Sequence, residues 1–483
     1  MYFKGLLGYL PANILQGLVG FATLTVFTRI LSPEDYGRYA LAYGAASLAQ
    51  TVFFVWLEAS MARFYPAEGR ENPEAPLLFG TIYRLHMAVI AVFAIACAAG
   101  LLLWPGHGAL KTAIGLSLGC VVFRSWAKLV QEQRRAEGRV TQASLIDMAQ
   151  TLGGFIIGVG CAYAGLGGAS PVVGVGLTAL LLLPFIARED WGRALKGRFD
   201  PERARHYAHY GFPVSASLIL TLGLYTADRF LIAHYLDAGQ AGAYHAGFSL
   251  ASRILDVLFV WFGAAGTPAM INALEHDGEA ALRQNARQQL TTMALVLFPA
   301  VGGLIMVAPS LGGLMIGGGL RDKALEVTPL ISIGALFSGL NTYYFLQAFT
   351  LARKTRLLVV AMAVPAIANI ALNVALIPVM GLIGAAWASA LSFALGLVAS
   401  WMLGFRAIAL PVPVWDLARI GACTAAMIAT LYVLPSWGGV AEIVLKSATG
   451  AVVYGALAWI LNINGIRAIA DAAFDRLRRK AFV

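Results

Sequence analysis

Two oppositely charged residues, Arg253 and Asp256, lie inside the long apolar stretch of residues 243–271. They are three residues apart, so a helix would place them on one face. A charge at membrane depth is costly and usually serves a function. The arginine would hold an anionic group with two or more acceptor oxygens bidentately, and the aspartate would orient the arginine or bind a proton or cation. The alternative is a structural ion pair that only neutralises itself.

Four more charged candidates lie in other apolar stretches. Asp228 and Arg229 are adjacent in residues 212–234, and a helix would direct them about 100° apart. One would face a cavity, or both would pack near the outer interface. Glu58 and Arg63 lie in the inner half of residues 39–62. Glu58 would line the cavity, whereas Arg63 either does the same or extends to the membrane surface.

Residues near the start of the chain complete the candidate set. Asn13 and Gln16 lie one turn apart in residues 8–30, where they would bind a sugar or join neighbouring helices. Arg29 ends this stretch and would bind substrate or anchor the helix at the interface. Asp147 is interpreted as a lone charge, and Lys128 is counted with the basic residues of an inner loop. We predict no catalytic residue and no metal ligand, because metal-binding and nucleotide-binding motifs are missing from the sequence.

The elements that carry these residues are predicted to be membrane helices. Of the 483 residues, 59% are hydrophobic and 12% are charged, and the mean hydropathy is +0.73. A soluble domain is about half apolar and a quarter charged. The apolar runs are long and continuous, which favours helices over the alternating strands of a barrel. At about 20 residues per span, we predict about fourteen transmembrane helices.

The distribution of positive charge predicts the orientation in the membrane. Alternate loops carry roughly 27 Lys and Arg residues against about 5 in the others, a strong positive-inside bias. Both termini are therefore predicted to be cytoplasmic. The net charge of +10 is interpreted as contact with anionic lipid rather than with nucleic acid.

An internal repeat divides the chain. LSPEDYGRYALAYGAAS from Leu31 aligns with LDAGQAGAYHAGFSLAS from Leu236, and Gly37 lies opposite Gly242. The shift covers six spans, so the halves have the same orientation, as in transporters with parallel repeats. We predict a six-helix lobe at 1–187, a basic cytoplasmic connector at 188–210, a second six-helix lobe at 211–405, and two further helices with an amphipathic tail at 406–483.

Three segments resemble the polysaccharide (O-antigen type) flippases of the multidrug/oligosaccharidyl-lipid/polysaccharide (MOP) exporter superfamily. They are TRILSPEDYGRYAL (Thr28–Leu41), YTADRFLIAHYLDAGQAGAY (Tyr225–Tyr244) and NIALNVALIPVMGLIGAAWAS (Asn369–Ser389). The resemblance extends over nearly the whole chain. It implies a MATE-like fold of two six-helix bundles around a V-shaped cavity, alternating access, and a location in the bacterial inner membrane.

The resemblance also implies a substrate, a glycan linked to undecaprenyl pyrophosphate, and no enzyme activity. A polysaccharide polymerase and a chain-length regulator are expected partners by family. No cofactor is expected, and H⁺, Na⁺ or the membrane potential would drive transport. A lipid II flippase and a MATE-type, cation-coupled drug antiporter remain alternatives within the superfamily. A membrane polymerase or glycosyltransferase is disfavoured, because the predicted outer loops are short.

Overall fold

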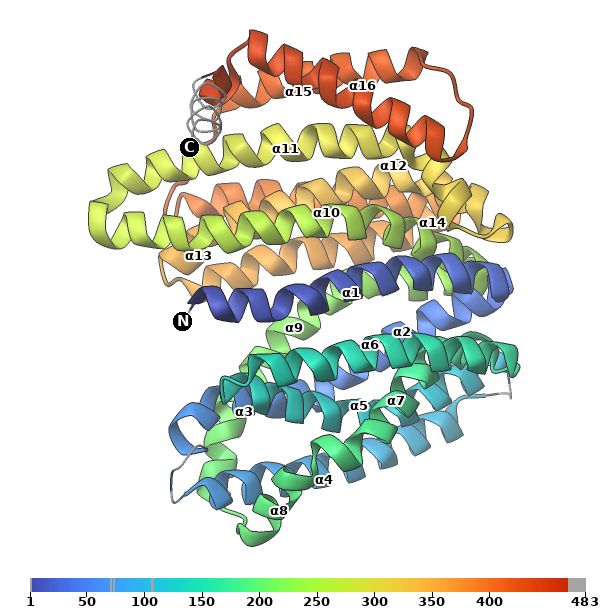
Figure 1. Cartoon of the computed structure of the whole chain (residues 1–483), viewed down its shortest axis with the longest axis vertical. Helices are drawn as coiled ribbons and strands as arrows, with labels where there is room; N and C mark the ends of the chain where they lie inside the picture. The colour runs from blue at the N-terminus through green and yellow to red at the C-terminus, as the bar shows by residue number, and fades with distance from the viewer. Residues whose placement is uncertain (1, 70–71, 73, 106–107, 468–483) are drawn as a thin grey trace, which may run out of the picture. The chain divides into compact units, whose positions relative to one another are not determined.

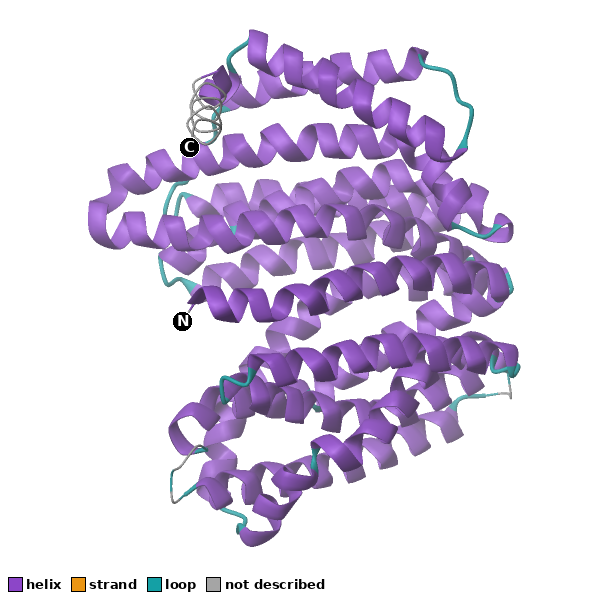
Figure 2. Ribbon diagram, in the orientation of Figure 1, coloured by secondary structure: helices purple, strands orange, loops and turns teal. Residues whose placement is uncertain are grey.

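The computed structural model describes residues 2–69, 72, 74–105 and 108–467. The predicted amphipathic tail falls mostly outside these residues. The described residues are almost entirely helical and include no strand (Figure 2), which confirms the predicted all-helical membrane fold. They form two compact units, Met1–His245 and Ala246–Val483, which are described separately.

The first unit contains nine helices and the start of a tenth among its described residues (Figure 1). They are α1 (Tyr2–Ile30), α2 (Pro33–Phe53), α3 (Val55–Glu68), α4 (Ala75–Leu103), α5 (Ala109–Ala136), α6 (Val140–Tyr163), α7 (Ser170–Ile186), α8 (Arg188–Lys196), α9 (Pro201–Tyr235) and the first turns of α10 (Ala238–Asn272), with a 3₁₀ turn at Gly167–Ala169. α2 and α3 together are long and apolar enough for one span, with a bend of 48° between them. An aromatic core that includes Tyr83, Trp126 and Tyr207 packs α3, α4, α5, α8 and α9 together.

The second unit begins inside α10 and ends with the last described residues. It contains a π-helical turn (Ala273–Asp277), α11 (Gly278–Met315), α12 (Gly318–Leu340), a second π-helical turn (Asn341–Phe345), α13 (Gln347–Leu351), α14 (Thr355–Gly404), α15 (Val414–Val433), α16 (Gly439–Ile460) and a 3₁₀ turn (Ile463–Gly465). The last two helices pack on α11 through a core that includes Ile420, Met427 and Tyr454.

The helices agree with the predicted number of spans. The described residues contain eleven candidate spans, or twelve if the bent α2–α3 pair is one span. Two candidates are long enough for two crossings at about 20 residues each: Ala238–Met315 with 78 residues, and Thr355–Gly404 with 50. α14 turns at Gly381, whose φ of 62° lies in the left-handed region that favours glycine. Counting each long candidate twice gives about fourteen.

The internal repeat is visible in the helix boundaries. α1 ends at Ile30 and α9 at Tyr235, while α2 begins at Pro33 and α10 at Ala238, so both boundaries recur after 205 residues. The repeat-related glycines also meet. A Cβ atom on Gly242 would lie 2.8 Å from the backbone nitrogen of Gly37, and one on Gly37 would lie 1.6 Å from the carbonyl oxygen of Ala238. The starts of α2 and α10 therefore pack backbone to backbone.

Candidate substrate-binding and coupling residues

Glu58 lies one turn after the bend between α2 and α3. The break falls at Phe54, which is fully buried. The half-buried Glu58 carboxylate accepts a hydrogen bond from Nε2 of Gln50, on the other side of the bend. The side-chain amide oxygen of Gln50, Oε1, is buried and has no hydrogen-bond partner among the described residues. A carboxylate is thus held at membrane depth by a single neutral donor.

Lys128 and Asp147 form a second polar group, between α5 and α6. The Lys128 ammonium lies 3.5 Å from Oδ1 of Asp147, and the side chains are 27% and 13% exposed. Lys128 also donates to Oε1 of Gln131 at 2.8 Å. The other Asp147 oxygen accepts a hydrogen bond from Gln16 of α1. The group therefore links three helices of the first unit.

The two groups act on each other, and we call them the inner polar network: Gln16, Gln50, Glu58, Lys128, Gln131 and Asp147. The Lys128 ammonium attracts the carboxylates of both Glu58 and Asp147. Arg124 adds a second positive charge one turn earlier on α5. Glu132 is also near, but Arg135 binds it at 2.6 Å. The two carboxylates of the network thus interact with two cations, Lys128 and Arg124, and a proton added to either carboxylate would leave these four groups with a net positive charge.

The spacing of polar residues on α5 indicates this network, but counting Lys128 with an inner loop obscures it. Lys128, predicted in an inner loop, lies inside α5, and Asp147 is not a lone charge. Arg124, Lys128, Gln131 and Arg135 recur at the i, i+4, i+7 and i+11 positions of one helix face. That spacing indicates that α5 continues to Ala136 with a polar stripe.

Arg253 and Asp256 lie near the middle of α10, in the second unit. Arg253 is half-buried, and its Nε is buried with no hydrogen-bond partner among the described residues. Asp256 is exposed on the described chain. The two residues form no ion pair within 4.0 Å there. The guanidinium is therefore a membrane-depth cation with a donor still to be satisfied.

The next turns of α10 pack against the second π-helical turn. Phe259 stacks on Tyr343 of the second π-helical turn, with ring centroids 5.7 Å apart and planes at 3°. Gly263 permits this approach, because a Cβ there would lie 2.5 Å from the Tyr343 ring. Gln289 of α11 donates to the Tyr343 carbonyl oxygen at 3.2 Å.

Asp228 and Arg229 are buried near the C-terminal end of α9 and point to different partners, as adjacent helical residues do. Asp228 accepts a hydrogen bond from the Tyr244 hydroxyl at 2.8 Å. Arg229 donates from Nε to Nδ1 of His245 at 3.0 Å. Both contacts bind α9 to the first turns of α10. Substrate binding by these two residues stays a prediction.

The remaining predicted residues lie on exposed faces of the described chain. Arg63 on α3 and Asn13 on α1 are exposed. Arg29 is exposed as well and donates to the Thr25 carbonyl oxygen of its own helix at 2.7 Å. Of the two amides predicted on α1, Gln16 is the one that the structure connects to another candidate, Asp147.

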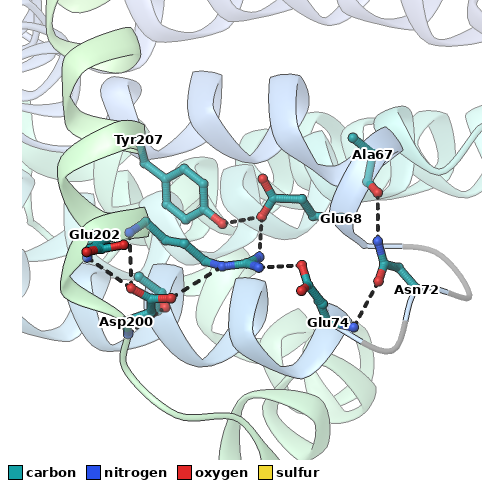
Figure 3. Close-up of polar contacts among 9 residues, drawn as sticks. Ala67, Glu68, Asn72, Glu74, Asp200, Glu202 and Tyr207 are labelled. Atoms are coloured by element: carbon teal, nitrogen blue, oxygen red, sulfur yellow. Dashed lines mark hydrogen bonds and ion pairs between the residues drawn. The ribbon is translucent and has the colours of Figure 1, made fainter.

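A polar cluster that the sequence analysis does not predict fixes the start of α9 (Figure 3). Arg203 binds Glu68 of α3 at 2.7 Å and Glu74 before α4. The Tyr207 hydroxyl donates to the same Glu68 oxygen at 2.6 Å. Asp200 caps the helix by accepting hydrogen bonds from the backbone nitrogens of residues 202 and 203. The signal in the sequence is the Asp-Pro-Glu string, which is typical of a helix start.

The connector contains a buried acid. Asp190 on α8 is fully buried, and neither of its carboxylate oxygens has a hydrogen-bond partner among the described residues. Its nearest cations are Arg134 at 3.7 Å and Arg193 at 4.0 Å. Burial raises the pKa of the Asp190 carboxyl to about 6, although the two guanidinium groups act in the opposite direction.

Several solved structures have the same fold as this chain. The lipid II flippase MurJ in an inward closed conformation matches with a TM-score of 0.77 and 15% identity, over 95% of this chain and 99% of that chain. An inward-facing multidrug resistance MATE family transporter matches with a TM-score of 0.63 and 14% identity, over 88% and 96%. An outward-facing MATE family transporter matches with a TM-score of 0.52 and 16% identity, over 83% and 95%. These matches show the fold, which is the one that the MurJ flippase and the MATE family transporters share.

The sequence identifies the protein family. Residues 26–319 match the family described as polysaccharide biosynthesis protein, which is more than half of the chain. The chain therefore belongs to the polysaccharide biosynthesis protein family, which confirms the resemblance. The matched residues contain Thr28–Leu41 and Tyr225–Tyr244, whereas Asn369–Ser389 lies outside them. A comparison with curated proteins gives no match.

Proposed function

We propose that the protein is a flippase that moves an undecaprenyl-pyrophosphate-linked oligosaccharide across the bacterial inner membrane by alternating access, for polysaccharide export. The family match supports the polysaccharide substrate class. The observation that carries the proposal is Arg253, a cation at membrane depth with an unsatisfied Nε–H. The protein is proposed to act within the lipid bilayer, with both termini in the cytoplasm.

Arg253 has the chemistry that a pyrophosphate needs. A guanidinium presents a rigid fork of donors to phosphate oxygens and stays charged when it is dehydrated. Burying a charge is expensive unless it is paired, and nothing within ion-pair distance compensates Arg253 in the described chain. Substrate binding would supply the missing anion. Asp256, one turn later, would keep a second anionic group from binding at the same time.

We propose that the inner polar network couples transport to H⁺. The sequence has no phosphate-binding loop of the GxxxxGK[ST] type, so the energy would come from an ion gradient or the membrane potential. Glu58 spans the α2–α3 bend through its bond to Gln50. Protonation would remove the attraction between Glu58 and Lys128 and leave two cations, Lys128 and Arg124, against one carboxylate. Such a change would alter the angle at the bend.

The experiment for the proposal is transbilayer movement of a fluorescent lipid-linked oligosaccharide in proteoliposomes. Wild type is compared with Arg253→Ala and with Arg283→Ala, whose guanidinium is exposed and already binds Glu279 at 2.9 Å. A hydrogen bond to a charged group is worth about 1.5–3 kcal/mol. We expect Arg253→Ala to slow movement about 10- to 100-fold, and Arg283→Ala to leave it unchanged.

The outcomes separate the parts of the proposal. Movement that Arg253→Ala leaves intact would retain the flippase and remove Arg253 from the head-group site. Movement of lipid II, but not of polysaccharide precursors, would favour the first alternative, a lipid II flippase. Cation-driven drug efflux without lipid movement would favour the second, a MATE-type antiporter.

A further inference from the structure

One corner of the second unit carries four exposed basic residues. Arg353, Lys354 and Arg356 lie at the turn between α13 and α14, and Arg406 follows the end of α14. The Lys354 ammonium donates to the Arg406 carbonyl oxygen, so the two turns are adjacent. We call these four residues the basic corner. It lies on the side that the positive-inside bias predicts to be cytoplasmic.

The charge of the basic corner is not compensated by the chain. The sequence contains no Asp or Glu between Glu326 and Asp416. Within the described residues, none of the four basic side chains has a carboxylate within 4.0 Å. Other inner basic residues of this unit differ, since Arg283 binds Glu279 at 2.9 Å and Arg287 binds Asp416 at 3.1 Å. Four positive charges are thus available to an external anion.

A shallow apolar hollow adjoins the basic corner. Its lining includes Phe345, Trp401, Gly404 and Phe405. The Trp401 and Phe405 side chains are 42% and 63% exposed, although they are large and apolar. A Cβ on Gly404 would meet nothing within 4 Å, so that glycine opens onto free space. The hollow therefore has an apolar wall, and Arg406 of the basic corner directly follows Phe405 of its lining.

One polar group in the lining has no partner. Ser400 is fully buried, and its hydroxyl makes no hydrogen bond among the described residues. The hydroxyls of Thr328 and Ser332 in the same unit instead bond the carbonyl oxygen four residues earlier, at 2.7 and 2.8 Å. An unsatisfied hydroxyl in an apolar setting is unfavourable. The hydroxyl is itself buried, so a ligand oxygen in the hollow would bind it once the side chains of the lining move aside.

We infer that this corner is a binding site for an anionic phospholipid. The phosphate binds the basic corner, a glycerol or ester oxygen accepts from Ser400, and the first methylenes of an acyl chain lie against Trp401 and Phe405. Positive-inside topology accounts for the four charges alone, but not for the unpaired hydroxyl or the open hollow beside them. The site is independent of the proposed transport function.

The test uses the full-length protein in detergent micelles and two lipid probes, brominated phosphatidylglycerol and brominated phosphatidylcholine. Bromine quenches a tryptophan that it contacts, so the Trp401 signal is the difference in quenching between wild type and Trp401→Phe. We expect phosphatidylglycerol to quench this signal at concentrations at least tenfold lower than phosphatidylcholine. The preference arises because each basic residue near an anionic lipid strengthens binding about fivefold.

Two kinds of variant distinguish a specific lipid-binding site from nonspecific attraction to surface charge. Gly404→Leu fills the hollow and keeps every charge, and we expect it to weaken phosphatidylglycerol binding at least fivefold. A triple variant of the corner is matched by a triple variant of exposed basic residues in the connector. The corner variant is R353Q/K354Q/R406Q, and the control is R188Q/K196Q/R205Q. The corner variant should lose the preference for phosphatidylglycerol, and the control should keep it.

Three results would overturn the inference. Equal quenching by the two lipids would remove the charge selectivity. Wild-type binding by Gly404→Leu would mean that the hollow takes no part, and this variant decides the question even if the triple variant fails to fold. Displacement of phosphatidylglycerol from Trp401 by equimolar polyprenyl phosphate would assign the site to the transported lipid instead.

Discussion

Replacement of Gly37 by alanine tests the backbone contact between the starts of α2 and α10. The new methyl carbon would lie 1.6 Å from the Ala238 carbonyl oxygen. Ordinary contact requires about 3.5 Å, so the two backbones would have to separate by about 2 Å. Side chains cannot absorb this shift, because the nearest atoms are all backbone atoms.

The size of the effect follows from two opposing terms. Alanine in a helix is more stable than glycine by about 0.5–1 kcal/mol. Overpacking costs about 1–3 kcal/mol, and more when backbone must move. The control is Gly223→Ala in α9, where a Cβ would meet nothing within 4 Å. We expect Gly37→Ala to lower the free energy of unfolding by about 1–2 kcal/mol and Gly223→Ala to raise it slightly.

The assay is thermal and denaturant-induced unfolding of the purified protein in one detergent, with both variants measured beside wild type. The opposite signs make the comparison robust against detergent effects that all three proteins share. Equal stability of Gly37→Ala and Gly223→Ala would refute the contact, and with it the meeting of the repeat-related glycines in the first unit.

Three other predictions concern charged groups. Glu58→Gln should abolish the pH dependence of transport while the protein stays folded; a flux that still varies with pH as in wild type would exclude Glu58 as the proton site. Asp190 has a folded-state pKa of about 6, raised from 3.8 by burial, so its contribution to stability is present below about pH 4 and is lost as the pH rises through 6. Between pH 4 and 8 the wild-type free energy of unfolding should therefore fall by up to about 3 kcal/mol through this group, and Asp190→Asn should remove that fall. An unchanged pH dependence of the free energy of unfolding would contradict the raised pKa of Asp190. Lys446 Nζ lies 2.5 Å from Glu442 Oε1, and both side chains are buried. Lys446→Met should therefore lower the free energy of unfolding by about 3–5 kcal/mol, and the double variant with Glu442→Gln should recover most of this loss. Additive losses in the double-mutant cycle would show that the pair is not coupled.

The fold could be predicted from the sequence because its signals are local. Long apolar runs specify membrane helices, and the 50-residue α14 is long enough for the two crossings that the turn at Gly381 separates. The repeat of Gly37 at Gly242 was also readable, but their direct contact was not. Two helix starts can be equivalent in sequence without touching, and the alignment contains no information on the distance between them.

The candidate site was predictable as a set of residues but not as a set of contacts. Single charges in apolar stretches, such as Arg253 and Glu58, stand out against their surroundings. Lys128 does not, because it lies near the end of its helix and is followed by basic residues that resemble a loop. Its pairing with Asp147 depends on how α5 and α6 pack, and a linear sequence does not specify which faces of two membrane helices meet.

The most direct test of the proposed function is a comparison of lipid substrates with the wild-type protein alone. Proteoliposomes containing fluorescent undecaprenyl-pyrophosphate-linked oligosaccharide, or lipid II, would be assayed for movement with and without a membrane potential and a proton gradient. We expect the oligosaccharide lipid to cross rapidly, with a rate that increases under an imposed gradient. The protein preparation must be monodisperse and stable. If neither lipid then crosses faster than in protein-free vesicles under any gradient, the result would contradict the flippase assignment.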